Sequence, residues 1–260
     1  MTRVKVDHQD HIARVTLTRG DKMNALDDAM IEAIVAAGHA VAASDARAVV
    51  LCGEGKSFCA GLDVASFAKL AQVDPAELLM PRSHGDANAL QELAMVWRRV
   101  PVPVIAALQG AVYGGGLQLA LGADIRIAGP DATLSVMEMK WGLVPDLGGM
   151  ALLPRLVRSD VLRQMIYTAR PIDAARAEAW GLVTSLADDP LAAALELAAQ
   201  IAGQSPSAIR AAKRLIEVAE REDRATVLLA ESREQCGLIG KPDQMEVIAA
   251  RMQGRAPKFG

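Results

Sequence analysis

Short, uninterrupted apolar segments are the feature that most constrains how this chain can fold. Residues 48–52 read AVVLC, and residues 102–108 are apolar apart from prolines at their start. Runs of this length with no polar positions are typical of strands that are buried on both faces of a parallel sheet. Residues 125–128 and 133–136 predict two further strands. Strands that alternate with helical stretches indicate an α/β fold with right-handed crossovers.

The two ends of the chain differ in pattern. Residues 4–6 and 12–17 alternate apolar and polar positions and predict a hairpin, after which Asn24 or Asp27 could cap a helix. From residue 190 onward, four amphipathic stretches predict consecutive helices at 191–201, 207–219, 225–236 and 243–251. We therefore expect an α/β core over residues 1–190 and a helical region over residues 191–260.

The composition narrows the function classes. The net charge is −3, so the chain has no basic surplus for binding nucleic acid. No stretch approaches the roughly 18 uncharged apolar residues of a membrane span. The three cysteines form no CxxC pair, which favours a reducing, cytoplasmic location, and the four histidines are scattered, so no metal site is expected.

Two glycine-containing turns, at residues 57–63 and 110–118, each follow a predicted strand. Backbone N–H groups at the end of a strand or the start of a helix lack partners and attract negative charge. Two such groups that point at one spot would form an oxyanion hole, in which each donor contributes about 2.7–4 kcal/mol to transition-state stabilisation.

A third segment, residues 137–149, supplies Glu138 and Asp146 among apolar neighbours. Desolvation there would raise the pKa of a carboxyl group toward the range that is useful for proton transfer. The Pro-Asp-Leu-Gly context of Asp146 also suits a helix N-cap, so both roles stay open.

Taken together, the motifs resemble the crotonase superfamily, also called the enoyl-CoA hydratase/isomerase family. The match covers nearly the whole chain. The matching segments are residues 22–26 (KMNAL), 58–63 (FCAGLD), 110–118 (GAVYGGGLQ), 122–125 (GADI), 138–149 (EMKWGLVPDLGG), 174–183 (AARAEAWGLV) and 255–259 (RAPKF).

This resemblance implies a crotonase-like (ClpP/crotonase) spiral of ββα units with a C-terminal helical trimerisation region, assembled as a homotrimer or as a hexamer built from two trimers. It implies an acyl-CoA substrate whose thioester oxygen lies between the N–H groups of Leu62 and Gly115. Coenzyme A would be bound as part of the substrate, with no separate cofactor and no metal. The implied binding residues are Met23, Ala25, Leu26, Ala60, Gly61, Leu62, Asp63, Val64, Gly114 and Lys258, with Arg255 as an alternative to Lys258.

The sequence departs from the family's hydratases at two positions. Those enzymes use two glutamates to activate water, but Gln118 stands at the first position and cannot exchange a proton near pH 7. Asp146 stands eight residues after Glu138, where the resemblance is closer to the dienoyl-CoA isomerases. We therefore expect Glu138 to be the main acid/base in double-bond isomerisation, with Asp146 as its partner, in fatty acid metabolism. A hydratase (a lyase) in which Gln118 orients water, and a non-catalytic acyl-CoA binder, are the alternatives.

Other residues near these motifs are expected to be structural. Asp63 and Asp124 would bond nearby backbone in turns, and Cys59 would pack, since no histidine is placed to activate it. Met137 and Trp141 are expected as pocket wall or core, and residues 64–95 as further walls of the acyl pocket.

Overall fold

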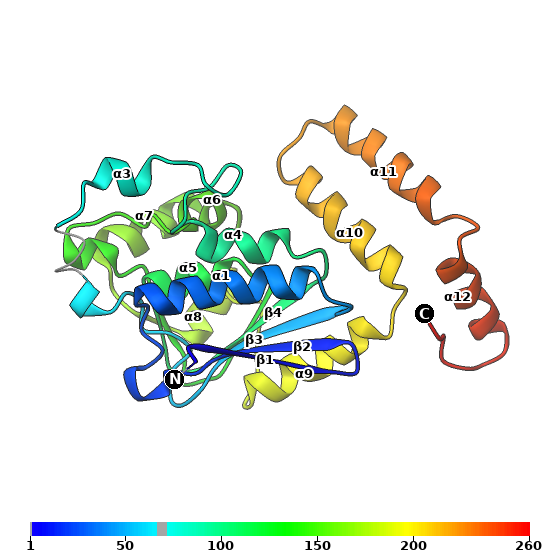
Figure 1. The fold of residues 1–260 in the computed structure, drawn as a ribbon, viewed down its shortest axis with the longest axis horizontal. Helices are drawn as coiled ribbons and strands as arrows, with labels where there is room; N and C mark the ends of the chain where they lie inside the picture. The colour runs from blue at the N-terminus through cyan, green and yellow to red at the C-terminus, as the bar shows by residue number, and fades with distance from the viewer. Residues whose placement is uncertain (1, 67–71) are drawn as a thin grey trace.

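A computed structural model describes residues 2–66 and 72–260 of the chain. Its centre is a six-stranded sheet in the order β1-β2-β3-β4-β6-β9 (Figure 1). The strands are β1 (Val4–Gln9), β2 (Ile12–Leu17), β3 (Ala48–Gly53), β4 (Val104–Leu108), β6 (Ile125–Ala128) and β9 (Ser185–Leu186). β1 and β2 form the predicted antiparallel hairpin, and the remaining pairs are parallel. The predicted strands and the crotonase-type α/β fold are confirmed.

A smaller sheet stands beside the first. Its three strands are β5 (Ala111–Tyr113), β7 (Thr133–Ser135) and β8 (Ile172–Asp173), in the order β5-β7-β8. β5 lies within the second glycine-containing segment, residues 110–118, and β7 directly precedes the segment that carries the two acids. The small sheet therefore brings these two segments side by side, because β5 pairs with β7 in parallel.

Helices cover both faces of the large sheet. On one face lie α1 (Asp28–Ala42) and α4 (Glu92–Arg99), against strand residues such as Val49 and Leu51. On the other face lies α9 (Pro190–Ala202), which packs Ala194 and Ala198 against residues that include Val50. α9 begins at the boundary expected between the core and the helical region, and it covers one face of the large sheet.

The start of α1 settles one alternative left by the sequence. The carboxylate of Asp27 accepts a hydrogen bond from the Met30 N–H at 2.8 Å and caps the helix. The fully buried Asn24 instead donates its amide to the carbonyl oxygens of Glu54 and Ser57. Asn24 thus joins the loop before α1 to the loop after β3, which the sequence did not indicate.

The last three helices leave the core as an arm that extends to the right in Figure 1. They are α10 (Pro206–Ala219), α11 (Arg224–Leu238) and α12 (Pro242–Met252). α10 and α11 pack against each other, yet α11 buries none of its residues. Large apolar side chains remain exposed on the arm, namely Ile216, Leu228, Leu229, Ile239, Met245, Ile248 and Met252.

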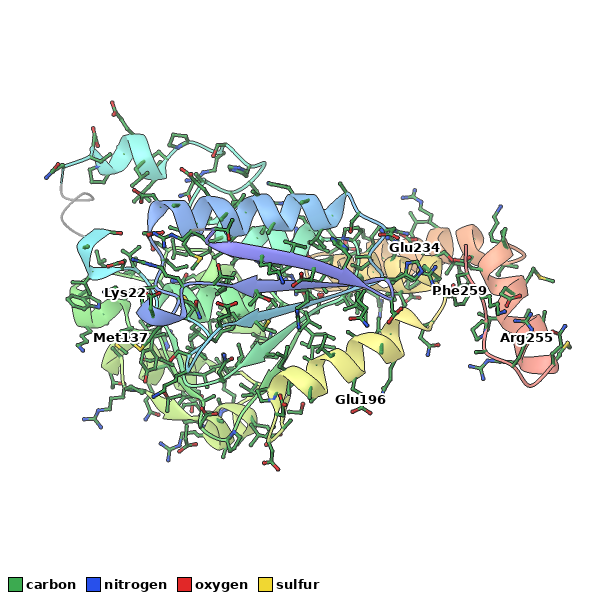
Figure 2. All side chains as sticks on the ribbon, turned by 60° about the horizontal axis from the view of Figure 1, so that its bottom comes forward. Lys22, Met137, Glu196, Glu234, Arg255 and Phe259 are labelled. Atoms are coloured by element: carbon green, nitrogen blue, oxygen red, sulfur yellow. The ribbon has the colours of Figure 1, made fainter. Side chains whose placement is uncertain are left out.

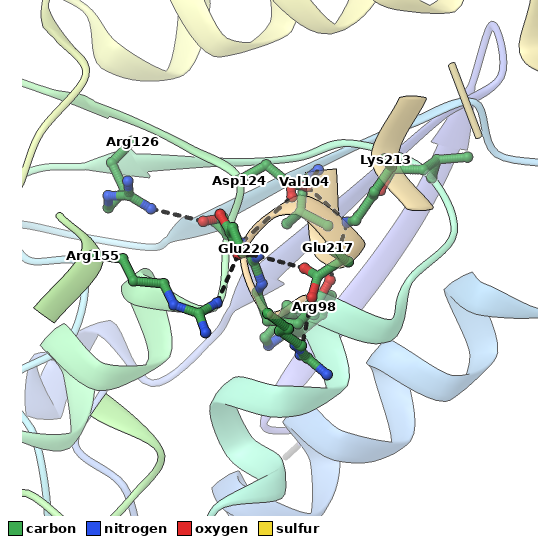
Figure 3. Close-up of polar contacts among 12 residues, drawn as sticks. Arg98, Val104, Asp124, Arg126, Arg155, Lys213, Glu217 and Glu220 are labelled. Carbon is green, nitrogen blue, oxygen red and sulfur yellow. Dashed lines mark hydrogen bonds and ion pairs between the residues drawn. The ribbon is translucent and has the colours of Figure 1, made fainter. Parts of the chain in front are cut away.

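A cluster of charged side chains attaches the arm to the core (Figure 3). The Lys213 ammonium, which is 8% exposed, donates to the Asp124 carboxylate at 2.7 Å and to the Val102 carbonyl at 3.0 Å. Asp124 also accepts from the Val104 N–H, and Arg98 pairs with acids of α10. The structural role expected for Asp124 is confirmed, and its carboxylate joins α10 to the start of β4.

The remaining helices are short: α3 (Pro75–Leu79), α5 (Gly115–Leu121), α6 (Gly149–Leu152), α7 (Ser159–Thr168) and α8 (Ala174–Ala179). The 3-10 turns are Gly20–Lys22, Glu138–Trp141 and Leu153–Arg155. Within the described residues, no helix is long and apolar enough to cross a membrane.

Candidate active site

An open pocket of about 820 Å³ lies where the two glycine turns meet the acidic segment. Its lining is mostly apolar, with two carboxyl groups from the segment after β7. The lining residues are Asp28, Ile31, Ala60, Gly61, Leu62, Ser66, Leu90, Gly114, Gly115, Met137, Glu138, Trp141, Leu143, Asp146 and Leu147. Ile31 was not expected in the pocket, because in the sequence it carries only the signal of an apolar helix face.

The first glycine turn presents the amide of Leu62. Leu26 pairs with this turn in parallel fashion: its N–H donates to the Gly61 carbonyl, and its carbonyl accepts from the Asp63 N–H. In a parallel bridge of this kind, the amide of the residue between the two bonded groups points to the opposite side. The Leu62 N–H therefore points away from Leu26, and it donates to no acceptor among the described residues.

The second glycine turn presents the amide of Gly115. Gly115 is the first residue of α5, where N–H groups have no partner inside the helix. Gly114, with φ 51°, donates its own N–H to the Ser135 carbonyl at 2.9 Å, which ties the turn to β7. Within the described part of the chain, the Gly115 N–H meets no acceptor.

The two turns approach each other so closely at Gly61 that this position has no room for a side chain. A Cβ atom on Gly61, which has φ 90°, would lie 2.6 Å from the Tyr113 carbonyl oxygen and 3.5 Å from the Gly115 nitrogen. A Cβ on Gly114 would lie 3.4 Å from Oε1 of Glu138. The two free amides and the Glu138 carboxyl therefore border one small region of the pocket.

Glu138 opens the 3-10 turn after β7 and is half-buried. Burial raises the pKa of its carboxyl, and the negative charge of Asp146 adds to the increase. Oε1 accepts a hydrogen bond from Gln118, whereas Oε2 is buried with no hydrogen-bond partner among the described residues. An unpartnered carboxylate oxygen is costly to bury, so this geometry favours the protonated form or a partner supplied by a ligand.

Gln118 holds the site together from α5. It is 2% exposed, and its Nε2 donates to Oε1 of Glu138 at 2.6 Å. Its Oε1 accepts from the Leu147 N–H at 2.8 Å and from the Gly149 N–H at 2.9 Å. Because two donors face the amide oxygen, the amide nitrogen must face Glu138. The sequence left a bond to Glu138 open, but the two bonds to the following loop were not foreseen.

Asp146 lies on the loop that Gln118 holds. α6 begins at Gly149 with Gly148 as its N-cap residue, and no side chain caps it. The capping role left open for Asp146 is therefore wrong. Asp146 keeps solvent access, yet the surrounding protein desolvates its carboxyl enough to raise its pKa.

The predicted binding residues are brought together with one exception. Ala60, Gly61, Leu62 and Gly114 line the pocket. Leu26 is buried below it and Ala25 is half-buried beside Leu26, while Met23 and Val64 are 51% and 63% exposed. The Asp63 carboxylate accepts from the Ala65 N–H and pairs with Arg19 at 2.8 Å, which lowers its pKa and confirms its structural role.

Lys258 is the exception. Met137 of the pocket and Phe259, next to Lys258, lie at opposite ends of the molecule (Figure 2). The Lys258 N–H donates to Glu246 of α12, so the arm carries this residue away from the pocket. Arg255 also pairs with Glu246. Within one chain, Lys258 and Arg255 therefore lie away from the pocket.

The remaining expectations concern residues near the pocket. Cys59 is fully buried, donates to the Asn24 carbonyl, and has a pKa raised to about 12 by burial, so it packs as expected. Met137 and Trp141 line the pocket. Ser66 and Leu90 come from the segment 64–95, of which residues 67–71 lie outside the described residues. Over residues 2–66 and 72–260, no cluster of His, Cys, Asp or Glu could hold a metal ion.

Comparisons with known proteins agree with this geometry. A family model described as "Enoyl-CoA hydratase/isomerase" matches residues 7–260. An enoyl-CoA hydratase/isomerase of Bacillus subtilis, YngF, is 34% identical over 95% of this chain and 93% of its own. The human mitochondrial Delta(3,5)-Delta(2,4)-dienoyl-CoA isomerase is 34% identical over 79% of this chain and 65% of its own. The crystal structure of an enoyl-CoA hydratase from Bacillus anthracis superposes with a TM-score of 0.87 and 30% identity, covering 99% of this chain and 98% of that one.

Proposed function

The chain belongs to the enoyl-CoA hydratase/isomerase family of acyl-CoA enzymes, and we propose that within this family it moves a carbon–carbon double bond along the acyl group of an enoyl- or dienoyl-CoA. The observation that carries the proposal is the presence of two carboxyl groups, Glu138 and Asp146, together with an amide, Gln118, at the position of the first of the two hydratase glutamates. The amide of Gln118 holds Glu138 but cannot move a proton.

The reaction would proceed through an enolate. One carboxylate removes a proton from the acyl carbon next to the thioester, or from the carbon that follows a double bond conjugated with the thioester. The electron pair of that C–H bond is delocalised onto the thioester oxygen. The N–H groups of Leu62 and Gly115 stabilise the negative oxygen without reorganising. The other carboxyl group then delivers a proton to a different carbon as the double bond shifts. The thioester is regenerated, and no water is consumed.

The electrostatics of the two acids suit such a transfer. Burial raises the pKa of both Glu138 and Asp146, which brings proton affinities closer to neutral pH than an exposed carboxyl group would have. Gln118 fixes both acids relative to each other, because it bonds Glu138 directly and bonds the backbone on the C-terminal side of Asp146. Glu138 is the main acid/base in this proposal, and Asp146 is its partner.

Hydration is the second candidate, since Glu138 alone could activate a water that Gln118 helps to orient. The structure of the Bacillus anthracis relative bears the name of a hydratase. Against efficient hydration, both hydrogen-bonding ends of Gln118 are already used within the protein. A third reading, a binder that performs no chemistry, requires that neither acid exchanges protons with a bound acyl group.

We also propose that the enzyme works as a homotrimer or as a hexamer of two trimers. α11 buries no residue within one chain, and the arm exposes seven large apolar side chains, a surface that a monomer rarely leaves uncovered. In such an assembly, Lys258 or Arg255 would reach a neighbouring subunit's coenzyme A rather than that of its own chain. A cytoplasmic location and a role in fatty acid metabolism belong to the same proposal.

A screen of enoyl-, dienoyl- and 3-hydroxyacyl-CoAs with product identification tests the proposed reaction. We expect an isomer as the product, and we expect Glu138→Gln to abolish both turnover and deuterium exchange at the α-carbon. A 3-hydroxyacyl-CoA as the main product of a trans-2-enoyl-CoA would instead establish hydration. Tight binding with no exchange for any compound would establish a binder.

A further inference from the structure

Asp146 borders both the main pocket and a second cavity, whereas Glu138 borders the main pocket and does not line this second cavity. The second cavity, of about 500 Å³, lies between the N-terminal part of α4 and the loop that leads into α6. It is lined by Asp86, Ala87, Gln91, Met95, Pro145, Asp146, Gly148, Met150 and Ala151. Asp146 therefore stands in the wall between the acyl pocket and a second opening.

This wall is held in place on both sides. Gln118 accepts from the N–H groups of Leu147 and Gly149, which fixes the backbone after Asp146. Gly148 has φ 94°, and a Cβ there would lie 2.9 Å from Cε of Met95, so the loop is packed closely against α4. An acyl group that fills the main pocket would leave the second cavity as it is.

The second cavity can hold water that exchanges with the bulk. The side chain of Asp86 at its rim is 77% exposed, and Met150 is 46% exposed. Gln91 adds a half-buried amide, so the cavity has the polar groups that ordered water needs. Glu138 has no such outlet: Oε1 bonds Gln118, and Oε2 is buried.

Resting on the proposed isomerase function, we infer that the second cavity is a proton-exchange port for Asp146. While the acyl group occupies the main pocket, the Asp146 carboxyl gives its proton to water in the second cavity and takes another from it, with no net change. Glu138 keeps the proton that it has removed until the product leaves. The two acids thus differ in isotope exchange, although both transfer protons.

The difference is measurable in D₂O with an isomer pair such as trans-2- and trans-3-hexenoyl-CoA. When Asp146 removes the proton, reversal of that step returns deuterium to the unreacted compound. When Glu138 removes it, reversal returns the original proton. We therefore expect unreacted starting material to gain deuterium in one direction of the reaction only, as measured by mass spectrometry and NMR at low conversion.

Narrowing the port tests the role of the second cavity directly. Ala151→Leu adds bulk to the cavity from the third residue of α6. Ala192→Leu is the matched control, because Ala192 is also exposed and is the third residue of its helix, α9, away from both cavities. We expect the ratio of deuterium exchange to net isomerisation to fall several-fold in Ala151→Leu and to stay at the wild-type value in Ala192→Leu.

The outcomes separate the inference from the function on which it rests. The port is overturned, while isomerisation stands, if the starting material gains deuterium equally in both directions or in neither. It is also overturned if the ratio of deuterium exchange to net isomerisation is unchanged in Ala151→Leu. No interconversion of the hexenoyl-CoA pair or of a 3,5-/2,4-dienoyl-CoA pair would overturn the proposed isomerase, and the port with it.

Discussion

Replacing Gln118 should reveal how much the site depends on one side chain. Gln118→Met keeps an unbranched side chain of similar length but leaves the N–H groups of Leu147 and Gly149 without their acceptor. A buried, unsatisfied polar group costs about 1–3 kcal/mol. Since the loop borders two open cavities and can relax toward water, we expect a loss of about 2 kcal/mol in the free energy of unfolding. In a chain of this size that corresponds to a fall in Tm of roughly 4–8 °C.

Gln118→Glu separates the two functions of this side chain. The carboxylate still accepts from both N–H groups, but it cannot donate to Glu138 unless it is protonated. Two adjoining carboxyl groups share a proton, which raises the pKa of the pair in the folded state above the unfolded value. The stability that this proton confers is complete below the unfolded pKa and is lost as the pH rises through the raised folded pKa.

Thermal unfolding between pH 4 and pH 8 distinguishes these effects. Gln118→Met should be destabilised at every pH, whereas Gln118→Glu should lose stability relative to wild type only as the pH rises. Hydration of trans-2-enoyl-CoA should also increase in Gln118→Glu, because a second proton-transferring group is restored. The reasoning is refuted if Gln118→Met is as stable as wild type, because the bonds to Leu147 and Gly149 would then contribute no stability. It is also refuted if the stability of Gln118→Glu relative to wild type does not change with pH.

Three further changes have defined outcomes. Gly61→Ala places a Cβ 2.6 Å from a backbone oxygen at a residue with positive φ, which should displace the amides of the oxyanion hole. We expect kcat to fall on the order of 100-fold with a smaller change in acyl-CoA affinity. An unchanged kcat in steady-state kinetics would contradict the oxyanion hole. Glu138→Gln should stabilise the protein at neutral pH, because burial raises the pKa of Glu138 in the folded state. Melting curves should show this gain shrink as the pH falls through the raised folded pKa and vanish below the unfolded pKa. Lys213→Met leaves Asp124 without its buried partner and should lower the free energy of unfolding by about 3–5 kcal/mol, as measured by denaturant unfolding. The double variant that adds Asp124→Asn should recover part of this loss. No recovery would argue against a stabilising ion pair.

Local patterns predicted most of the core correctly. The apolar runs that became β3 and β4 are buried on both faces because helices cover both faces, and such runs have few alternatives. The capping alternatives could not be resolved from sequence, since Asn24 and Asp27 are equally good cap residues. Only the approach of the 54–57 loop, a tertiary contact, determines that Asn24 bonds there and leaves the cap to Asp27.

The site was predictable as a set of residues but not as a geometry. The glycine turns and the two acids could be named because their residue types are tied to their chemistry. That Gln118 bonds Glu138 and the Leu147–Gly149 backbone at once depends on how α5 meets the loop before α6, which no local pattern encodes. The distance of Lys258 from the pocket could not be predicted for a similar reason: helix patterns predicted α10 to α12 but not that these helices would leave the core.

The central claim is that the amides of Leu62 and Gly115 polarise a thioester carbonyl beside Glu138. The vibrational frequency of that carbonyl reports this directly, measured by infrared or Raman difference spectroscopy on a bound acyl-CoA with a ¹³C-labelled thioester carbon. The account predicts that the carbonyl stretch shifts to lower frequency on binding to the wild-type protein and returns toward the free value in Gly61→Ala. A bound thioester whose carbonyl stretch equals that of free acyl-CoA would contradict it.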